Sequence, residues 1–173
     1  MVLTCAATAL RSSEIIALRW SDIHWEQGKI SISKRWAKGR DGETKTASST
    51  GTVPLHPVLA ESLKEWHVQT PYPKHDDFVF PSLAKFGNVP IWASTFVQDH
   101  LRPAAIKAGV QIAPGQRYGL HNCRHSPATW LANAGKVAPK TVQGLLRHAN
   151  VKTTLGLYTQ DDSDEMQAAQ GHS

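Results

Sequence analysis

The sequence predicts an α+β domain that is mainly α-helical and has a small three-stranded antiparallel sheet at one edge. Short apolar segments bounded by turn residues occur at 23–36 and 52–55, which is enough for three short strands. Apolar residues at helical spacing fill much of the remaining chain. With 173 residues, 40% of them hydrophobic, the chain can bury a full core. Residues 1–173 are therefore expected to form one domain, with a polar tail at 159–173.

The N-terminal half is expected to contain one short helix and the sheet. Residues 12–18 predict a helix that is capped by Ser12 or Ser13 and carries its apolar residues on one side. Residues 23–25 and 29–36 predict two strands around a turn, and residues 52–55 predict the third. The segment that follows residue 36 and ends at residue 50 is polar and rich in Gly, Ser and Thr, so it predicts a mobile loop.

The C-terminal half is expected to be mostly helical. Pro57 suits the first turn of a helix over 57–69, whose buried stripe would be Leu59, Leu63 and Trp66. The remaining elements are an extended piece at 77–81, a helix at 93–108 that is kinked or split by Pro103, and helices at 121–134, 139–146 and 153–159.

The charge distribution favours a polyanionic partner. The formal net charge is +5 and the isoelectric point is about 9.4. Cations gather in one hairpin-like segment, where they predict a ribbon that follows phosphates, although a merely solvated ribbon is the alternative. The cations of this segment are Lys29, Lys34, Arg35, Lys38, Arg40 and Lys45. Acidic residues gather instead at 161–165, which is a poor surface for DNA.

Cysteine usage and hydropathy exclude several classes of protein. Two cysteines, Cys5 and Cys123, give no disulfide framework and are expected to be buried thiols. No apolar run approaches the length of a membrane span, and the first ten residues lack a signal-peptide pattern. The chain is therefore expected to be soluble and cytoplasmic.

Histidine, arginine and tyrosine follow one another near the C-terminus in an order that suits phosphodiester chemistry. Residues 121–125 are His-Asn-Cys-Arg-His, residues 146–148 are Leu-Arg-His and residues 157–159 are Leu-Tyr-Thr. Two guanidinium groups, with Arg11 as the second, can hold the non-bridging oxygens of a phosphate. A histidine can move protons, a lysine such as Lys45 can protonate a leaving alkoxide, and a deprotonated tyrosine is a nucleophile. The set predicts transfer of a phosphodiester onto a tyrosine.

These segments resemble the tyrosine recombinase (phage integrase) family. Its first box is roughly Thr-Gly-Leu-Arg-x-x-Glu, and residues 8–14 are Thr-Ala-Leu-Arg-Ser-Ser-Glu. Its second box, His-x-x-Arg-His, is matched by residues 121–125. Its third box, Leu-Gly-His followed ten residues on by Tyr, is matched by residues 146–148 and Tyr158. The resemblance covers about residues 3–160.

The resemblance implies the DNA breaking-rejoining fold, and site-specific strand exchange through a 3′-phosphotyrosyl link without metal, cofactor or ATP. Lys45 is preferred as the catalytic lysine because Lys-Thr precedes a Val-Pro-Leu strand, as in the family. The implied catalytic residues are Arg11, Lys45, His121, Arg124, His148 and Tyr158. The expected DNA contacts are Lys34, Arg35, Lys38, Arg40 and Arg147. Glu14 is expected to hold Arg11 by an ion pair.

The expected partner is double-stranded DNA. The resemblance implies a tetramer on DNA for a full-length protein, whereas a monomer is expected for this chain alone. Only ten residues precede Arg11, so the helical domain that completes the family's clamp on DNA is expected to be absent. Weak DNA binding with little sequence preference is expected as a result.

The sequence departs from the family pattern at three places. Ala9 and Arg147 stand where the family has glycine, so Arg147 would either crowd the site or add a phosphate contact. Ser126-Pro127 follows the second box, and a proline there suits only the first turn of a helix, which would move the helix start to His125 or later.

Several alternatives stay open from the residues alone. The chain could be a non-catalytic DNA-binding remnant, or a topoisomerase-like enzyme that nicks and reseals with the same residues. Cys123 and His148 could join the second-box histidines in a zinc site, which the spacing disfavours. His125 could serve only to orient its neighbours.

Overall fold

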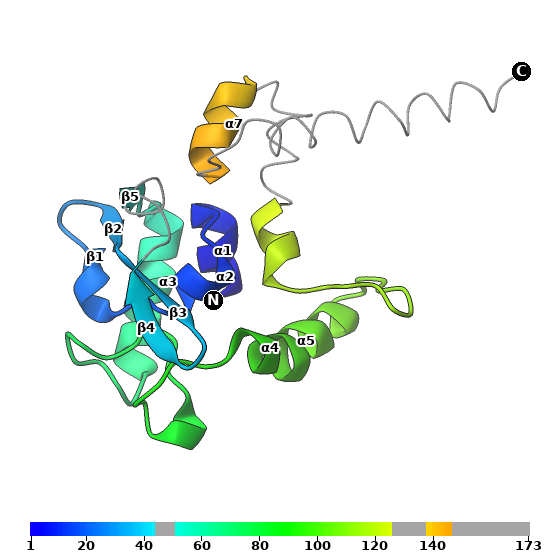
Figure 1. The fold of residues 1–173 in the computed structure, drawn as a ribbon, viewed down its shortest axis with the longest axis horizontal. Helices are drawn as coiled ribbons and strands as arrows, with labels where there is room; N and C mark the ends of the chain where they lie inside the picture. Colours follow the sequence, from blue (N-terminus) through cyan, green and yellow to red (C-terminus); the bar gives the residue numbers. More distant parts are fainter. Residues whose placement is uncertain (44–50, 126–137, 147–173) are drawn as a thin grey trace, which may run out of the picture.

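The computed structural model describes residues 1–43, 51–125 and 138–146 (Figure 1). Within these ranges the domain is helical with a small antiparallel sheet, and the fold class predicted from the sequence is confirmed. Helices α1 and α2 lie at the centre of Figure 1, with the strands and α3 to one side and α4 and α5 below. None of the helices in the described residues is long and apolar enough to cross a membrane.

Two short helices form the N-terminal core. Helix α1 is Val2–Thr8 and ends at Ala9, which adopts the left-handed conformation with φ of 51°. Helix α2 is Ser12–Ile15, and its N-cap is Arg11, with an extended backbone at φ −69° and ψ 149°. The predicted serine cap is therefore wrong, because the Glu14 carboxylate accepts the N–H of Arg11 and starts the helix one residue earlier.

The predicted three-stranded sheet is present. It consists of β1 (Ile23–His24), β2 (Lys29–Ile32) and β5 (Gly51–Pro54), antiparallel in the order β1-β2-β5. Ile30 pairs with Ile23 on one side and with Val53 on the other, and all three are buried. This row of apolar side chains fixes the register, because a slip by one residue would turn it to solvent.

The predicted strand 29–36 is in fact two strands. It breaks at Ser33, and β3 (Lys34–Ala37) leaves the sheet to pair with β4 (Arg40–Glu43) in a separate antiparallel hairpin. The loop predicted over residues 37–50 is therefore wrong for residue 37 and for residues 40–43. Lys38 and Gly39 close the hairpin, both with positive φ (54° and 77°), as a two-residue turn of the I′ kind requires.

Helix α3 is Pro57–Gln69, as predicted. Leu59 and Leu63 are buried in the core. Trp66 is half-buried, and its indole N–H donates to the carbonyl of Val79 at 2.6 Å. That bond ties α3 to the extended segment 77–81, which forms a β-bridge to Arg19 through Phe78.

The predicted helix 93–108 is split near Pro103, as expected. It consists of α4 (Ala93–Phe96), a π-helical turn at Val97–Leu101 and α5 (Arg102–Lys107). Pro103 lacks an N–H and its ring would clash with the carbonyl four residues earlier, so the helix widens there.

The C-terminal part contains two described helices. Residues 120–125 are helical, so the start at His125 or later that Pro127 suggested is wrong. Helix α7 is Pro139–Leu146, as predicted. Residues 126–134 of the predicted helix and the predicted helix 153–159 lie outside the described residues.

Candidate active site

Arg11 is held by the carboxylate three residues after it. Its Nη1 donates to Glu14 Oε1 at 2.9 Å, and its backbone N–H donates to Glu14 Oε2 at 3.0 Å. The Glu14 side chain is 3% exposed, whereas that of Arg11 is 40% exposed. The ion pair expected from the sequence is thus confirmed. It holds both the backbone N–H and one guanidinium nitrogen of Arg11, while the Arg11 side chain stays partly exposed.

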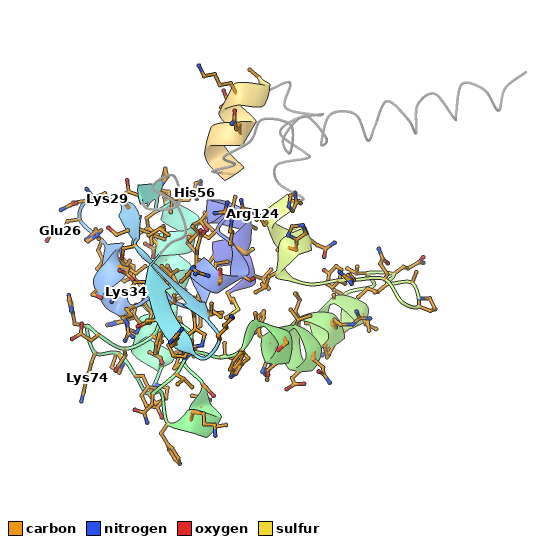
Figure 2. All side chains as sticks on the ribbon, viewed as in Figure 1. Glu26, Lys29, Lys34, His56, Lys74 and Arg124 are labelled. Atoms are coloured by element: carbon orange, nitrogen blue, oxygen red, sulfur yellow. The ribbon has the colours of Figure 1, made fainter. Side chains whose placement is uncertain are left out.

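Arg124 lies on the helix at 120–125 and is 5% exposed. Figure 2 shows it beside α1. His121 and His125 flank it one turn apart, with ring centroids separated by 4.1 Å. His121 is exposed and His125 is half-buried. One helical face therefore presents both histidines.

Cys5 joins the two segments that carry the arginines. Its Sγ lies 3.1 Å from the carbonyl oxygen of Leu120 and 3.9 Å from that of Leu10, the residue before Arg11. Cys5 is fully buried and Leu120 is 3% exposed. Residues more than one hundred apart in sequence thus meet at α1, so the first and second boxes share one packed support.

The two cysteines are poor nucleophiles. Burial, followed by the neighbouring Cys123, raises the pKa of the Cys5 thiol to about 12, although Arg124 opposes the shift. Burial also raises the pKa of Cys123. Both thiols are free, Cys5 is buried as predicted, and Cys123 is only half-buried, because helix 120–125 has solvent on its outer side. Both act as packing groups at neutral pH.

His125 stays neutral more readily than an ordinary histidine. Its burial lowers its pKa below 6.5, and the nearby His121 and Arg124 lower it further by repelling a second positive charge. A neutral ring at this place can donate one hydrogen bond and accept another, which suits an orienting role.

The β3–β4 hairpin presents the cations predicted to bind DNA. Lys34, Lys38 and Arg40 are exposed and Arg35 is half-buried. Strand β3 packs against α2, the helix that begins after Arg11. The hairpin and the first box are therefore neighbours.

Four predicted site residues, Lys45, Arg147, His148 and Tyr158, lie outside the described residues. In the part of the chain that is described, no three His, Cys, Asp or Glu side chains gather as a metal site would need. Sequence reasoning missed Arg19 and Asp41, which connect the hairpin to the domain body. Nothing in the sequence signals that contact, since it joins residues far apart.

The sequence profile described as the phage integrase family matches residues 1–165. The chain belongs to the phage integrase family. Among curated relatives, it is 28% identical to the "Tyrosine recombinase XerC-like" protein of Caldanaerobacter subterraneus subsp. tengcongensis, over 92% of this chain and 44% of that protein. It is 26% identical to the "Tyrosine recombinase XerA" of Pyrococcus furiosus, over 98% of this chain and 52% of that protein. This phage integrase chain therefore spans about half the length of these relatives.

Solved structures of the phage integrase family share the fold. The Tn1549 transposon integrase in complex with circular intermediate DNA superposes with a TM-score of 0.74 at 24% identity, over 97% of this chain and 58% of that one. The XerH site-specific recombinase bound to its difH substrate, in a pre-cleavage complex, gives a TM-score of 0.66 at 27% identity, over 91% and 41% of the two chains.

Proposed function

We propose that this chain is the catalytic domain of a site-specific DNA recombinase, which cleaves and rejoins strands through a 3′-phosphotyrosyl intermediate. The observation that carries the proposal is the convergence of the Arg11 and Arg124 segments on Cys5 in a member of the phage integrase family. Relatives of the same fold are solved with circular intermediate DNA and with a difH substrate, which supports duplex DNA as the partner.

In this mechanism, the phenolic oxygen of Tyr158 attacks the scissile phosphorus. A bond from that oxygen to phosphorus forms as the bond from phosphorus to the 5′-oxygen breaks. Arg11 and Arg124 hold the non-bridging oxygens, whose charge grows in the transition state. Lys45 gives a proton to the leaving 5′-oxygen, while His121 accepts the tyrosine proton and His148 donates a hydrogen bond to the phosphate.

The geometry of the described residues suits these roles. Arg124 is buried on a helix, so its guanidinium is held in place before DNA arrives. Arg11 is held by Glu14 through its backbone N–H and Nη1, and its side chain is 40% exposed, so it can contact a phosphate. The energy of the broken ester is kept in the phosphotyrosine, and a second 5′-hydroxyl can reverse the step without ATP.

The extent of the catalytic unit, its assembly, its location and its further DNA contacts follow from the same proposal. Residues 1–173 act as one catalytic unit, which works as part of a tetramer on DNA when the full protein is present and as a monomer alone. Chromosomal or element DNA as substrate places it in the prokaryotic cytoplasm. Arg147 and the hairpin cations contact phosphates outside the scissile one.

A covalent-adduct assay tests the proposal. The chain is mixed with nicked duplexes from its host element, denatured, and examined for labelled DNA that migrates with protein. We expect an adduct that is lost in Tyr158→Phe and kept in Tyr118→Phe, a half-buried tyrosine outside the motifs. DNA binding without an adduct in the wild type would refute catalysis by this chain and leave a DNA-binding remnant.

A further inference from the structure

Within the described residues, the β3–β4 hairpin makes no strand pairing with the three-stranded sheet. A two-stranded hairpin is marginally stable by itself in water. This hairpin nevertheless carries the cations that the proposed function uses to bind DNA. Side-chain contacts therefore help to fix its position on the domain, and one residue of the domain body makes an ion pair with the hairpin.

That residue is Arg19, which lies at the beginning of the 3₁₀ turn Trp20–Asp22. Its backbone is fixed from two sides, because its N–H donates to Asp22 Oδ2 at 2.9 Å and it forms a β-bridge with Phe78. Its guanidinium reaches outwards from this fixed base. Nη1 donates to the carbonyl of Asp76 at 2.6 Å, and Nη2 donates to Asp41 Oδ2 of strand β4 at 2.8 Å.

An aromatic contact supports the same connection. The Arg19 guanidinium carbon lies 4.1 Å from the centroid of the Phe78 ring, close enough for a cation–π interaction. The ring of Trp36, on strand β3, meets Phe78 edge-on at a centroid distance of 5.5 Å and an angle of 86°. Phe78 is 2% exposed and belongs to the buried core of the domain.

The two hairpin residues that make these contacts, Trp36 and Asp41, face each other across the hairpin. Trp36 and Asp41 are direct cross-strand partners, so their side chains lie on the same face of the hairpin. Side chains alternate between faces along a strand, which places Arg35 and Arg40 on the opposite face. The hairpin is therefore fixed by one face while its other face carries two of the predicted phosphate contacts.

We propose that Arg19 is a positioning residue, which anchors the β3–β4 hairpin through Asp41 and Phe78 and so orients the hairpin cations towards DNA. The DNA part of this inference rests on the proposed function, whereas the anchor itself does not. Arginine suits the task because its planar fork binds two acceptors at once while its face covers an aromatic ring.

Amide hydrogen exchange tests the anchor without DNA. In Arg19→Gln and in Asp41→Asn, the amides of residues 34–43 should exchange roughly ten times faster or more. The reason is that local opening of the hairpin no longer has to break the Arg19 contacts. Amides of α3 should keep their protection in both variants. Lys64→Gln, which removes one exposed cation paired with Glu61, is the matched control and should change neither segment. Unchanged exchange over residues 34–43 in both variants would overturn the anchor.

Salt dependence of DNA binding tests the positioning. The slope of log affinity against log salt should become shallower by about 0.9 for each hairpin phosphate contact that is lost in Arg19→Gln and Asp41→Asn. The direction of the change in DNA affinity for Asp41→Asn is the most decisive result. That variant makes the hairpin more positive, so simple electrostatics predicts tighter binding with a steeper slope, whereas loss of orientation predicts the reverse.

Tighter binding by Asp41→Asn would overturn the positioning role even if exchange supports the anchor. A partly unfolded variant would lose affinity by a similar factor at all salt concentrations, so it would leave the slope unchanged. A wild-type chain that fails to bind DNA would refute the proposed function and with it the positioning role, while hydrogen exchange would still decide the anchor.

Discussion

Replacing Glu14 by glutamine should both destabilise the domain and slow the chemistry. The carboxylate accepts two hydrogen bonds, from the backbone N–H of Arg11 at 3.0 Å and from its Nη1 at 2.9 Å. A glutamine amide has one oxygen to offer, so its NH₂ group must face one of these two donors. Since Glu14 is 3% exposed, water cannot replace the lost bond on the Glu14 side.

The size of the effect follows from which bond is lost. Loss of a helix cap costs about 1 kcal/mol, and up to about 2 kcal/mol in some proteins. Loss of the contact to the guanidinium costs about 1 kcal/mol, at the low end for a charged hydrogen bond because the Arg11 side chain is 40% exposed. Whichever bond is lost, we expect the free energy of unfolding to fall by about 1–2 kcal/mol. For a chain of this size, that corresponds to a fall in melting temperature of roughly 2–8 °C.

Urea unfolding at pH 7.5 measures the first effect and the covalent-adduct rate at saturating DNA measures the second. Glu61→Gln is the matched control, since Glu61 pairs with Lys64 at the same spacing of three residues but both side chains are exposed. The Glu61→Gln substitution should lower the free energy of unfolding by less than about 0.5 kcal/mol. We expect Glu14→Gln to slow adduct formation about tenfold by releasing Arg11. Equal unfolding free energies for the two variants would refute the cap, and an unchanged adduct rate would refute the orientation of Arg11.

Two further predictions concern proton transfer and pH. Lys45→Ala should slow adduct formation on an ordinary phosphodiester but not on one in which sulfur replaces the 5′-bridging oxygen, because a thiolate leaves without a proton. The control variant Lys38→Ala should not distinguish the two substrates. An equal loss of rate on both substrates for Lys45→Ala would rule out general acid catalysis by that lysine. Because the pKa of His125 is lowered from 6.5 in the folded state, the unfolded chain binds more protons, so stability should fall as pH drops below about 6.5. Between pH 8 and pH 5.5, the free energy of unfolding in urea should fall less for His125→Gln than for the wild type. Identical pH profiles for the two proteins would contradict the lowered pKa of His125.

The parts of the fold that the sequence predicted well depend on local signals. Helix α3 begins at Pro57 and α7 at Pro139, and proline favours the first turn because it has no N–H to leave unpaired. The split near Pro103 follows from the same missing N–H inside a helix. In each case one residue type dictates the backbone whatever the rest of the chain does.

The parts that were missed depend on neighbours. The sequence predicts a loop in place of strand β4 because the turn before it starts at Lys38, and a lysine with positive φ is not a recognisable hairpin signal. The cap of α2 was assigned to a serine because a cap at Arg11 depends on a carboxylate folding back from Glu14.

The candidate site shows the same division. Motif spacing identified Arg11 and Arg124 without any knowledge of the fold. It could not show that Cys5 contacts the backbone of both segments, because a contact between residues 5 and 120 has no local signature. The anchor from Arg19 to the hairpin is hidden for the same reason. Long-range packing is what turns separate motifs into one surface.

One local pattern occurs twice near the site and has two different results. In both places an arginine caps a short helical turn and an acidic residue three positions later accepts its backbone N–H, as Glu14 does for Arg11 and Asp22 for Arg19. The glutamate is one methylene longer, so its second oxygen also reaches the guanidinium of its own arginine. Among the described residues, Asp22 accepts a hydrogen bond only from the backbone of Arg19, and the Arg19 guanidinium extends instead to Asp76 and Asp41. A difference of one methylene thus separates an arginine held close to its own helix, where the proposed function needs it for a phosphate, from one that reaches across to a strand.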